Sequence, residues 1–217
     1  MRIGVLGTGV VGRTLATKLV SLGHDVMMGS RQAGNETAVE WARSGGQRAD
    51  AGTFSDAAGF GELVVNATAG GASVDALVSC EAENLAGKVL VDVSNPLDFS
   101  GGMPPTLTVC NNDSLGEQIQ RTFPDARVVK TLNTVNAAVM VDPGTVPGSH
   151  TIFVAGDDAD AKATVEGLLV DFGWPADAVM DLGGIEAARG LEMYLPLWLR
   201  IYGATGTASA TIRVVTP

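Results

Sequence analysis

Three glycines near the start of the chain have the spacing of a phosphate-binding turn. They stand in Gly7-Thr8-Gly9-Val10-Val11-Gly12, after an apolar segment (residues 2–6) and before leucines at helical spacing (residues 11–22). In such a strand–turn–helix the first glycine permits the tight turn, the second lets the backbone approach a pyrophosphate, and the third lets helix pack on strand. Free N–H groups at the helix start favour the phosphate charge. The motif therefore predicts a dinucleotide site formed by residues 7–12.

A hydroxyl and a guanidinium follow the second predicted strand, where dinucleotide-binding proteins distinguish their cofactors. Residues 25–28 lead into Gly29-Ser30-Arg31, and no Asp or Glu stands there to bind the ribose 2′-hydroxyl of NAD. Ser30 and Arg31 suit a 2′-phosphate instead, through charge-assisted hydrogen bonds, and Thr8 adds a second hydroxyl. We therefore expect an NADP(H)-selective site. The alternative is a glycine-rich turn beside an incidental surface arginine.

Small polar residues follow three later predicted strands. Because the carboxyl ends of parallel strands meet at one edge of a sheet, these residues should form the rim of a ligand site. We expect them to line the ribose and the nicotinamide, although Ser, Asn and Pro also end strands in ordinary loops. They are Ala67, Thr68 and Ala69, then Ser94, Asn95 and Pro96, then Asn133 and Thr134.

The predicted rim has no histidine and no pair of acidic residues. That favours hydride transfer between two cofactor rings, which needs placement rather than a dedicated acid or base. Reduction of a carbonyl would instead require a proton donor. Lys130 stands three residues before Asn133 but within a predicted strand, so the two side chains should point to opposite faces. We expect Lys130 to be structural.

The alternation of strands and helices predicts the fold class. Further strand-like segments at residues 63–68, 89–93 and 127–132, with helices between them, indicate an α/β protein with a Rossmann-type doubly wound parallel sheet. A turn-rich connector begins near residue 142. We therefore expect a dinucleotide-binding domain at residues 1–141 and a small C-terminal α/β subdomain at residues 142–217 that closes the nicotinamide pocket.

The last predicted helix, residues 185–202, is apolar nearly all round. It should be buried or form part of a homodimer surface, and Pro196 should kink or split it. Residues 210–215 could pair as an edge strand. Arg189 and Arg200 could reach an anionic substrate, but pairing with Glu186 or Glu192 is the simpler expectation.

Composition limits the partners. The chain has 217 residues and a net charge of −10, from 24 acidic and 14 basic residues, without a basic patch for nucleic acid. Its two cysteines and two histidines lack metal-ligand spacing, so we expect no metal site. No window reaches the ~20 apolar residues of a membrane helix, and Met1 leads directly into the first strand, without a signal peptide. We expect a soluble cytoplasmic protein whose partner is a small molecule.

Three stretches carry a family resemblance. Residues 1–9, Gly29-Ser30-Arg31, and Lys130-Thr131-Leu132-Asn133-Thr134 resemble the coenzyme F420-dependent NADP oxidoreductases, which are related to the cytosolic domain of six-transmembrane metalloreductases. The resemblance covers nearly the whole chain. It implies hydride transfer between NADPH and a flat deazaflavin or flavin.

The resemblance also implies roles for single residues. Thr8, Ser30 and Arg31 would bind the 2′-phosphate, whereas Thr68, residues 94–96 and Leu132-Asn133-Thr134 would line the hydride-transfer end. Two positions depart from the family. Asn133 stands where deazaflavin-reducing members are expected to carry histidine. A basic residue that is expected a few positions after Arg31, to help bind the 2′-phosphate, is absent, and Asn35 is the nearest polar substitute.

Three functions stay open at this point. The first is an NADPH-dependent reductase of F420 or a flavin, with Asn133 and Thr134 as candidate catalytic residues. The second is a reductase of a small carbonyl or imine substrate, helped by Lys130 or Thr134. The third is a non-catalytic NADP(H)-binding sensor, because a cofactor site does not by itself establish turnover.

Overall fold

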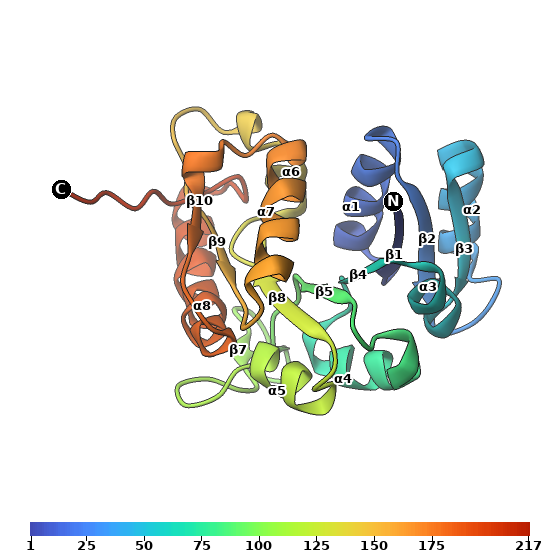
Figure 1. Ribbon diagram of the computed structural model, residues 1–217. Helices are drawn as coiled ribbons and strands as arrows, with labels where there is room; N and C mark the ends of the chain where they lie inside the picture. Colours follow the sequence, from blue (N-terminus) through green and yellow to red (C-terminus); the bar gives the residue numbers. More distant parts are fainter.

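A single eight-stranded sheet organises the chain. The structure, a computed structural model, describes residues 1–217 and has the strand order β10-β9-β8-β5-β4-β1-β2-β3 (Figure 1). The six strands from β8 to β3 are parallel, as predicted. They are β1 (Arg2–Leu6), β2 (Asp25–Ser30), β3 (Ala49–Thr53), β4 (Leu63–Asn66), β5 (Val89–Asp92) and β8 (Arg127–Thr131).

Helices cover both faces of this sheet. Because successive strand residues point to opposite faces, Val89 and Val91 face one helical layer and Leu90 faces the other. The first layer has α1 (Val10–Ser21), α2 (Glu36–Gly45), α6 (Ala137–Val141) and α7 (Ala159–Phe172). The second has α3 (Phe54–Phe60), α4 (Gly70–Val78), α5 (Leu115–Thr122) and the start of α8 (Ala188–Thr205). The predicted doubly wound Rossmann-type fold is confirmed.

The C-terminal strands extend the same sheet. β9 (Ile152–Ala155) pairs with β8 in the antiparallel direction, and β10 (Val179–Asp181) continues parallel to β9. The apolar pattern of a short buried strand does not encode its direction, which is why the sequence indicated only a separate α/β unit. The division into domains at residue 142 stays a prediction.

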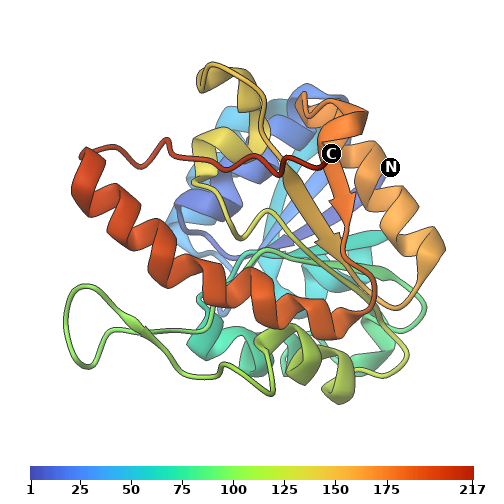
Figure 2. The ribbon, with the colours of Figure 1, turned by 90° about the vertical axis from the view of Figure 1, so that its left-hand side faces the viewer.

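The last helix and a hairpin arm project from the body. The arm carries β6 (Leu97–Asp98) and β7 (Thr106–Leu107), and Figure 2 shows it beside the C-terminal half of α8. α8 continues through Pro196 without being split, since Leu191 and Leu195 keep one side of it packed. No helix combines the length and apolar character needed to cross a membrane.

The predicted edge strand at residues 210–215 does not form. The tail instead runs back over the body (Figure 2), where the Thr151 N–H donates to the Ile212 carbonyl at 2.9 Å. The Val214 N–H donates to the Thr151 hydroxyl at 3.0 Å. Two hydrogen bonds to one residue fix the tail without forming a ladder.

Candidate active site

The glycine turn has the geometry that its sequence predicts. Gly7 has φ of +114°, which side chains other than glycine rarely adopt, and a Cβ on Gly12 would lie 2.0 Å from the Gly7 carbonyl oxygen. Gly9 is exposed and faces open space. It caps α1 without a side-chain hydrogen bond, so the N–H groups of the first turn are free to bind an anion.

Ser30 and Arg31, which are predicted to bind the 2′-phosphate, follow a strand next to this turn. β1 and β2 are neighbours, and the Gly7 N–H donates to the Gly29 carbonyl at 3.0 Å. Arg31 is exposed and makes no ion pair. The Ser30 hydroxyl donates to the Gln32 carbonyl at 2.7 Å and can still accept a hydrogen bond. Asn35 caps α2 by accepting from the Ala38 N–H at 3.1 Å, which leaves its NH₂ group for a ligand.

A cavity of about 510 Å³ adjoins the turn at the carboxyl ends of β4, β5 and β8. The structure brings together there most of the residues predicted for the rim. Pro96 and Leu132 lie outside the lining; both are buried beside it. The predicted residues that line the cavity are Val11, Ala67, Thr68, Ala69, Ser94, Asn95, Asn133 and Thr134.

The opposite side of the cavity is formed by residues that were not predicted from the sequence as site residues. Leu195, Trp198 and Leu199 of α8 line it, together with Phe99 of the hairpin arm. The indole N–H of Trp198 donates to the Ala210 carbonyl at 3.0 Å, and its ring stacks on Tyr202. The tail therefore fixes an aromatic side chain in the cavity wall. The apolar character of the last helix was the one signal in the sequence.

The cavity has no ionisable side chain. Its lining includes no Asp, Glu, Lys, Arg, His, Cys or Tyr. Thr134, which is 4% exposed, is the lining residue whose hydroxyl has no hydrogen-bond partner in the protein, while the hydroxyls of Thr68 and Ser94 are engaged. Arg200 lines a separate groove against the arm. The site is therefore suited to placing rings rather than to acid–base chemistry.

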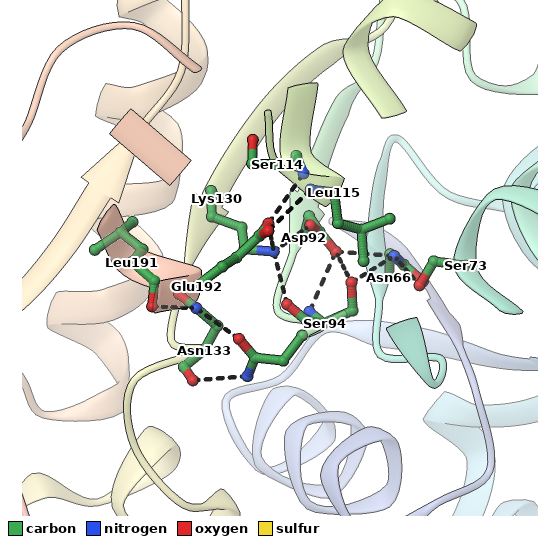
Figure 3. A network of polar contacts seen from close by, with 12 residues as sticks. Asn66, Ser73, Asp92, Ser94, Ser114, Leu115, Lys130, Asn133, Leu191 and Glu192 are labelled. Atoms are coloured by element: carbon green, nitrogen blue, oxygen red, sulfur yellow. Dashed lines mark hydrogen bonds and ion pairs between the residues drawn. The ribbon is translucent and has the colours of Figure 1, made fainter. Parts of the chain in front are cut away.

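A buried polar network lies directly behind the cavity (Figure 3). The Lys130 ammonium contacts one carboxylate oxygen each of Asp92 and Glu192 at 2.8 Å, and all three side chains are at most 1% exposed. Burial alone lowers the pKa of Lys130, but the two carboxylates outweigh it, so this pKa lies above the ordinary value. Lys130 does not line the cavity, and its burial between two carboxylates agrees with the expectation of a structural role, which stays a prediction.

The expected partners of Arg189 were wrong. Arg189 binds Glu117 of α5, with Nε 2.8 Å from Oε2, and this contact holds the pKa of Glu117 below its usual range. Glu192 is occupied by Lys130 and by the backbone of α5. Spacing along one helix predicted pairs within that helix. The packing of α5 against α8 instead gives both Arg189 and Glu192 partners on α5.

A tight turn and three side-chain hydrogen bonds shape the rim. The Asn133 N–H donates to the Thr131 carbonyl at 2.7 Å across Leu132, whose φ is +61°, as in the rarer kind of γ-turn. The Asn133 side chain donates to Asn95 Oδ1 at 2.9 Å, and Asn95 donates back to the Asn133 carbonyl at 2.9 Å. Asn133 also donates to the Leu191 carbonyl of α8 at 3.1 Å. The strand ends and the last helix are thus fixed to one another.

Comparisons with known proteins identify the family. A family model described as "NADP oxidoreductase coenzyme F420-dependent" matches residues 2–96. The crystal structure of a candidate F420-dependent NADP-reductase from Arthrobacter sp. FB24 is 52% identical, covers 100% of both chains and superposes with a TM-score of 0.94. The chain belongs to the coenzyme F420-dependent NADP oxidoreductase family.

Other proteins share sequence or fold with this chain at lower identity. The F420-dependent NADP reductase of Methanothermobacter marburgensis is 29% identical over 99% of this chain and 98% of its own length. Metalloreductase STEAP3 of Rattus norvegicus is 30% identical over 91% of this chain, which spans 38% of that protein. A reductive aminase from Aspergillus terreus, 19% identical with a TM-score of 0.65 over 94% of this chain and 62% of its own, shares the fold.

Membership of the coenzyme F420-dependent family confirms the resemblance seen in the sequence. The protein is an NADP-dependent oxidoreductase. The hypothesis of a non-catalytic sensor is thereby set aside.

Proposed function

We propose that this oxidoreductase transfers a hydride between NADP(H) and a planar deazaflavin or flavin acceptor of the coenzyme F420 type. The observation that carries the proposal is the cavity, which is predominantly apolar and holds no ionisable side chain. Hydride transfer between two stacked rings needs close, fixed placement, because the rings themselves carry the reactivity. The names of the family and of its reductases supply the acceptor class.

The proposed cofactor contacts follow the cavity and the turn. Residues 7–12 would bind the pyrophosphate, and Thr8, Ser30, Arg31 and Asn35 the 2′-phosphate. The ribose and nicotinamide would lie against the β4 and β5 ends, and Asn133 and Thr134 would face the reacting rings. The rim residues assigned to ribose and nicotinamide are Ala67, Thr68, Ala69, Ser94, Asn95, Pro96 and Leu132.

Reduction of a carbonyl or imine receives less support. That reaction needs a proton donor near the nascent alkoxide or amine. Lys130 is sealed behind Ser94 and held by two carboxylates, so it offers no accessible proton. Among the hydroxyl groups that line the cavity, only that of Thr134 has no hydrogen-bond partner in the protein, and the unpartnered Asn133 Oδ1 can accept but not donate a proton.

Anaerobic stopped-flow measurement tests the proposal. NADPH would be mixed with the enzyme and with F420, FMN or a panel of small ketones and imines. We expect F420 or FMN to oxidise NADPH in a single turnover, and the ketones and imines to leave it unchanged. Turnover of a ketone or imine while F420 and FMN stay inert would overturn the proposal.

A further inference from the structure

The cavity has two walls, and the buried charges behind it contact one of them at Ser94 and belong to the helix of the other through Glu192. The strand-end wall is Ser94 and Asn95, and the helix wall is Leu195, Trp198 and Leu199 of α8. Figure 3 shows side chains from β4, β5, β8 and α8 converging next to Ser94. Three buried charged side chains are unusual in the core of such a sheet, and we therefore asked what they hold in place.

Glu192 fixes the helix wall. Its carboxylate accepts from the Leu115 N–H at 2.9 Å and the Gly116 N–H at 3.0 Å, at the start of α5, and binds Lys130 at 2.8 Å. The favourable charge at a helix start adds to these contacts. Leu195 and Leu199 follow one and two turns later on the same helix, so the position of Glu192 determines theirs.

Lys130 fixes the strand-end wall. Its ammonium donates to the Ser94 carbonyl at 2.6 Å and to Asp92 Oδ2 at 2.8 Å. The other oxygen of Asp92 accepts from the Ser94 hydroxyl at 2.6 Å, from the Ser94 N–H at 3.2 Å and from Asn66 at 2.8 Å. The backbone and side chain of Ser94 are therefore both held from behind.

Buried charges tolerate few arrangements. Their desolvation is offset only when geometry is good and the remaining donors and acceptors are paired, and removal of one partner leaves an uncompensated charge. Each oxygen of Asp92 and Glu192 has at least one donor here. A shift of α8 away from β8 would break the contact between Lys130 and Glu192, and Lys130 is also bound to Asp92 and Ser94 at the end of β5, so the walls keep one separation.

We propose that Glu192 is a positioning residue that sets the separation of the two walls, and with it the distance over which hydride moves. The inference rests on the proposed function for its kinetic consequence. It assigns no chemical step to Glu192, which touches neither cofactor nor acceptor. In this proposal, the N-terminal part of α8 that carries Glu192 does not move relative to the strand ends.

The test compares E192Q with E117Q. Glu117 also joins α5 to α8, through Arg189, but does not line the cavity, so E117Q controls for lost contact between the same helices. The measurements are NADPH affinity, kcat and KM with the acceptor, thermal stability, and hydrogen exchange of residues 93–98 and 194–200 with NADPH bound. E192D, which keeps the charge but has a shorter reach, replaces E192Q where that variant does not fold.

For E192Q we expect kcat to fall ~10- to 100-fold, because a misplacement of about 1 Å has that effect. NADPH affinity should fall less than kcat, since the phosphate contacts at the glycine turn and Arg31 follow β1 and β2, which β5 and β4 separate from β8. Exchange should rise in both wall segments. E117Q should lower thermal stability and leave kcat and both segments unchanged.

Two results would overturn the inference: an unchanged kcat with unchanged exchange in E192Q, or equal losses of kcat in E192Q and E117Q. Hydrogen exchange needs no acceptor. If the wild-type enzyme reduced neither F420 nor FMN, the proposed function would fail, whereas increased exchange in both wall segments of E192Q alone would still support the positioning role.

Discussion

Replacing Arg31 by Ala tests the basis of cofactor selectivity. Arg31 follows β2 beside the glycine turn, is exposed and has no ion-pair partner, so its guanidinium is available to a 2′-phosphate. NADH lacks that phosphate. Removal of the guanidinium should therefore weaken NADPH and leave NADH nearly unaffected.

The magnitude follows from the kind of contact. A hydrogen bond to a charged group contributes about 1.5–3 kcal/mol, and exposure places Arg31 toward the lower half of that range because solvent and salt screen the charges. A loss of about 1.5–2 kcal/mol corresponds to an increase of about 10- to 30-fold in the Kd for NADPH. The Kd for NADH should rise less than about twofold.

Fluorescence titration with both dinucleotides at two salt concentrations measures these values. Arg13, exposed on α1 and also without an ion-pair partner, provides the matched control R13A. The NADPH affinity of R31A should depend less on salt than that of the wild type. Equal losses for NADPH and NADH, or an equal effect of R13A, would refute the assignment of the phosphate site.

Three further changes probe the rim and the stability of the fold. In G70A the new Cβ would lie 1.9 Å from the Asn95 carbonyl oxygen; we expect about 1–3 kcal/mol lower stability and slower single-turnover hydride transfer, and a wild-type rate would contradict this. L132A removes a side chain that is 3% exposed and should lower the free energy of unfolding, measured by urea denaturation, by about 2–5 kcal/mol. A loss below ~1 kcal/mol would be evidence against tight packing of that turn. The Arg121 guanidinium lowers the pKa of Asp113 to about 2. The contribution of the Asp113 carboxylate to the stability of the fold is therefore complete above pH ~4 and is lost as pH falls toward 2. The difference in unfolding free energy between wild type and D113N should shrink over that interval, and a constant difference would count against the ion pair.

The parallel core and the cofactor turn could be predicted from the sequence, because both depend on local patterns. A strand, three glycines and a helix are contiguous, and the conformation of Gly7 and the close approach at Gly12 depend on residues nearby in the chain. The rim followed from one rule, since parallel strands place their carboxyl ends at the same edge. Ser94 and Asn133 could therefore be brought together without knowledge of the packing.

The sequence could not determine which side chains complete the cavity or what lies behind it. Nothing local fixes the antiparallel direction of β9, and helical spacing assigned Arg189 to partners on its own helix when it binds Glu117 of α5. The contact between Lys130 and Glu192 joins a strand to a helix far along the chain. No periodicity encodes such a contact, because it forms only when packed elements exclude water and bring the buried charges within reach of one another.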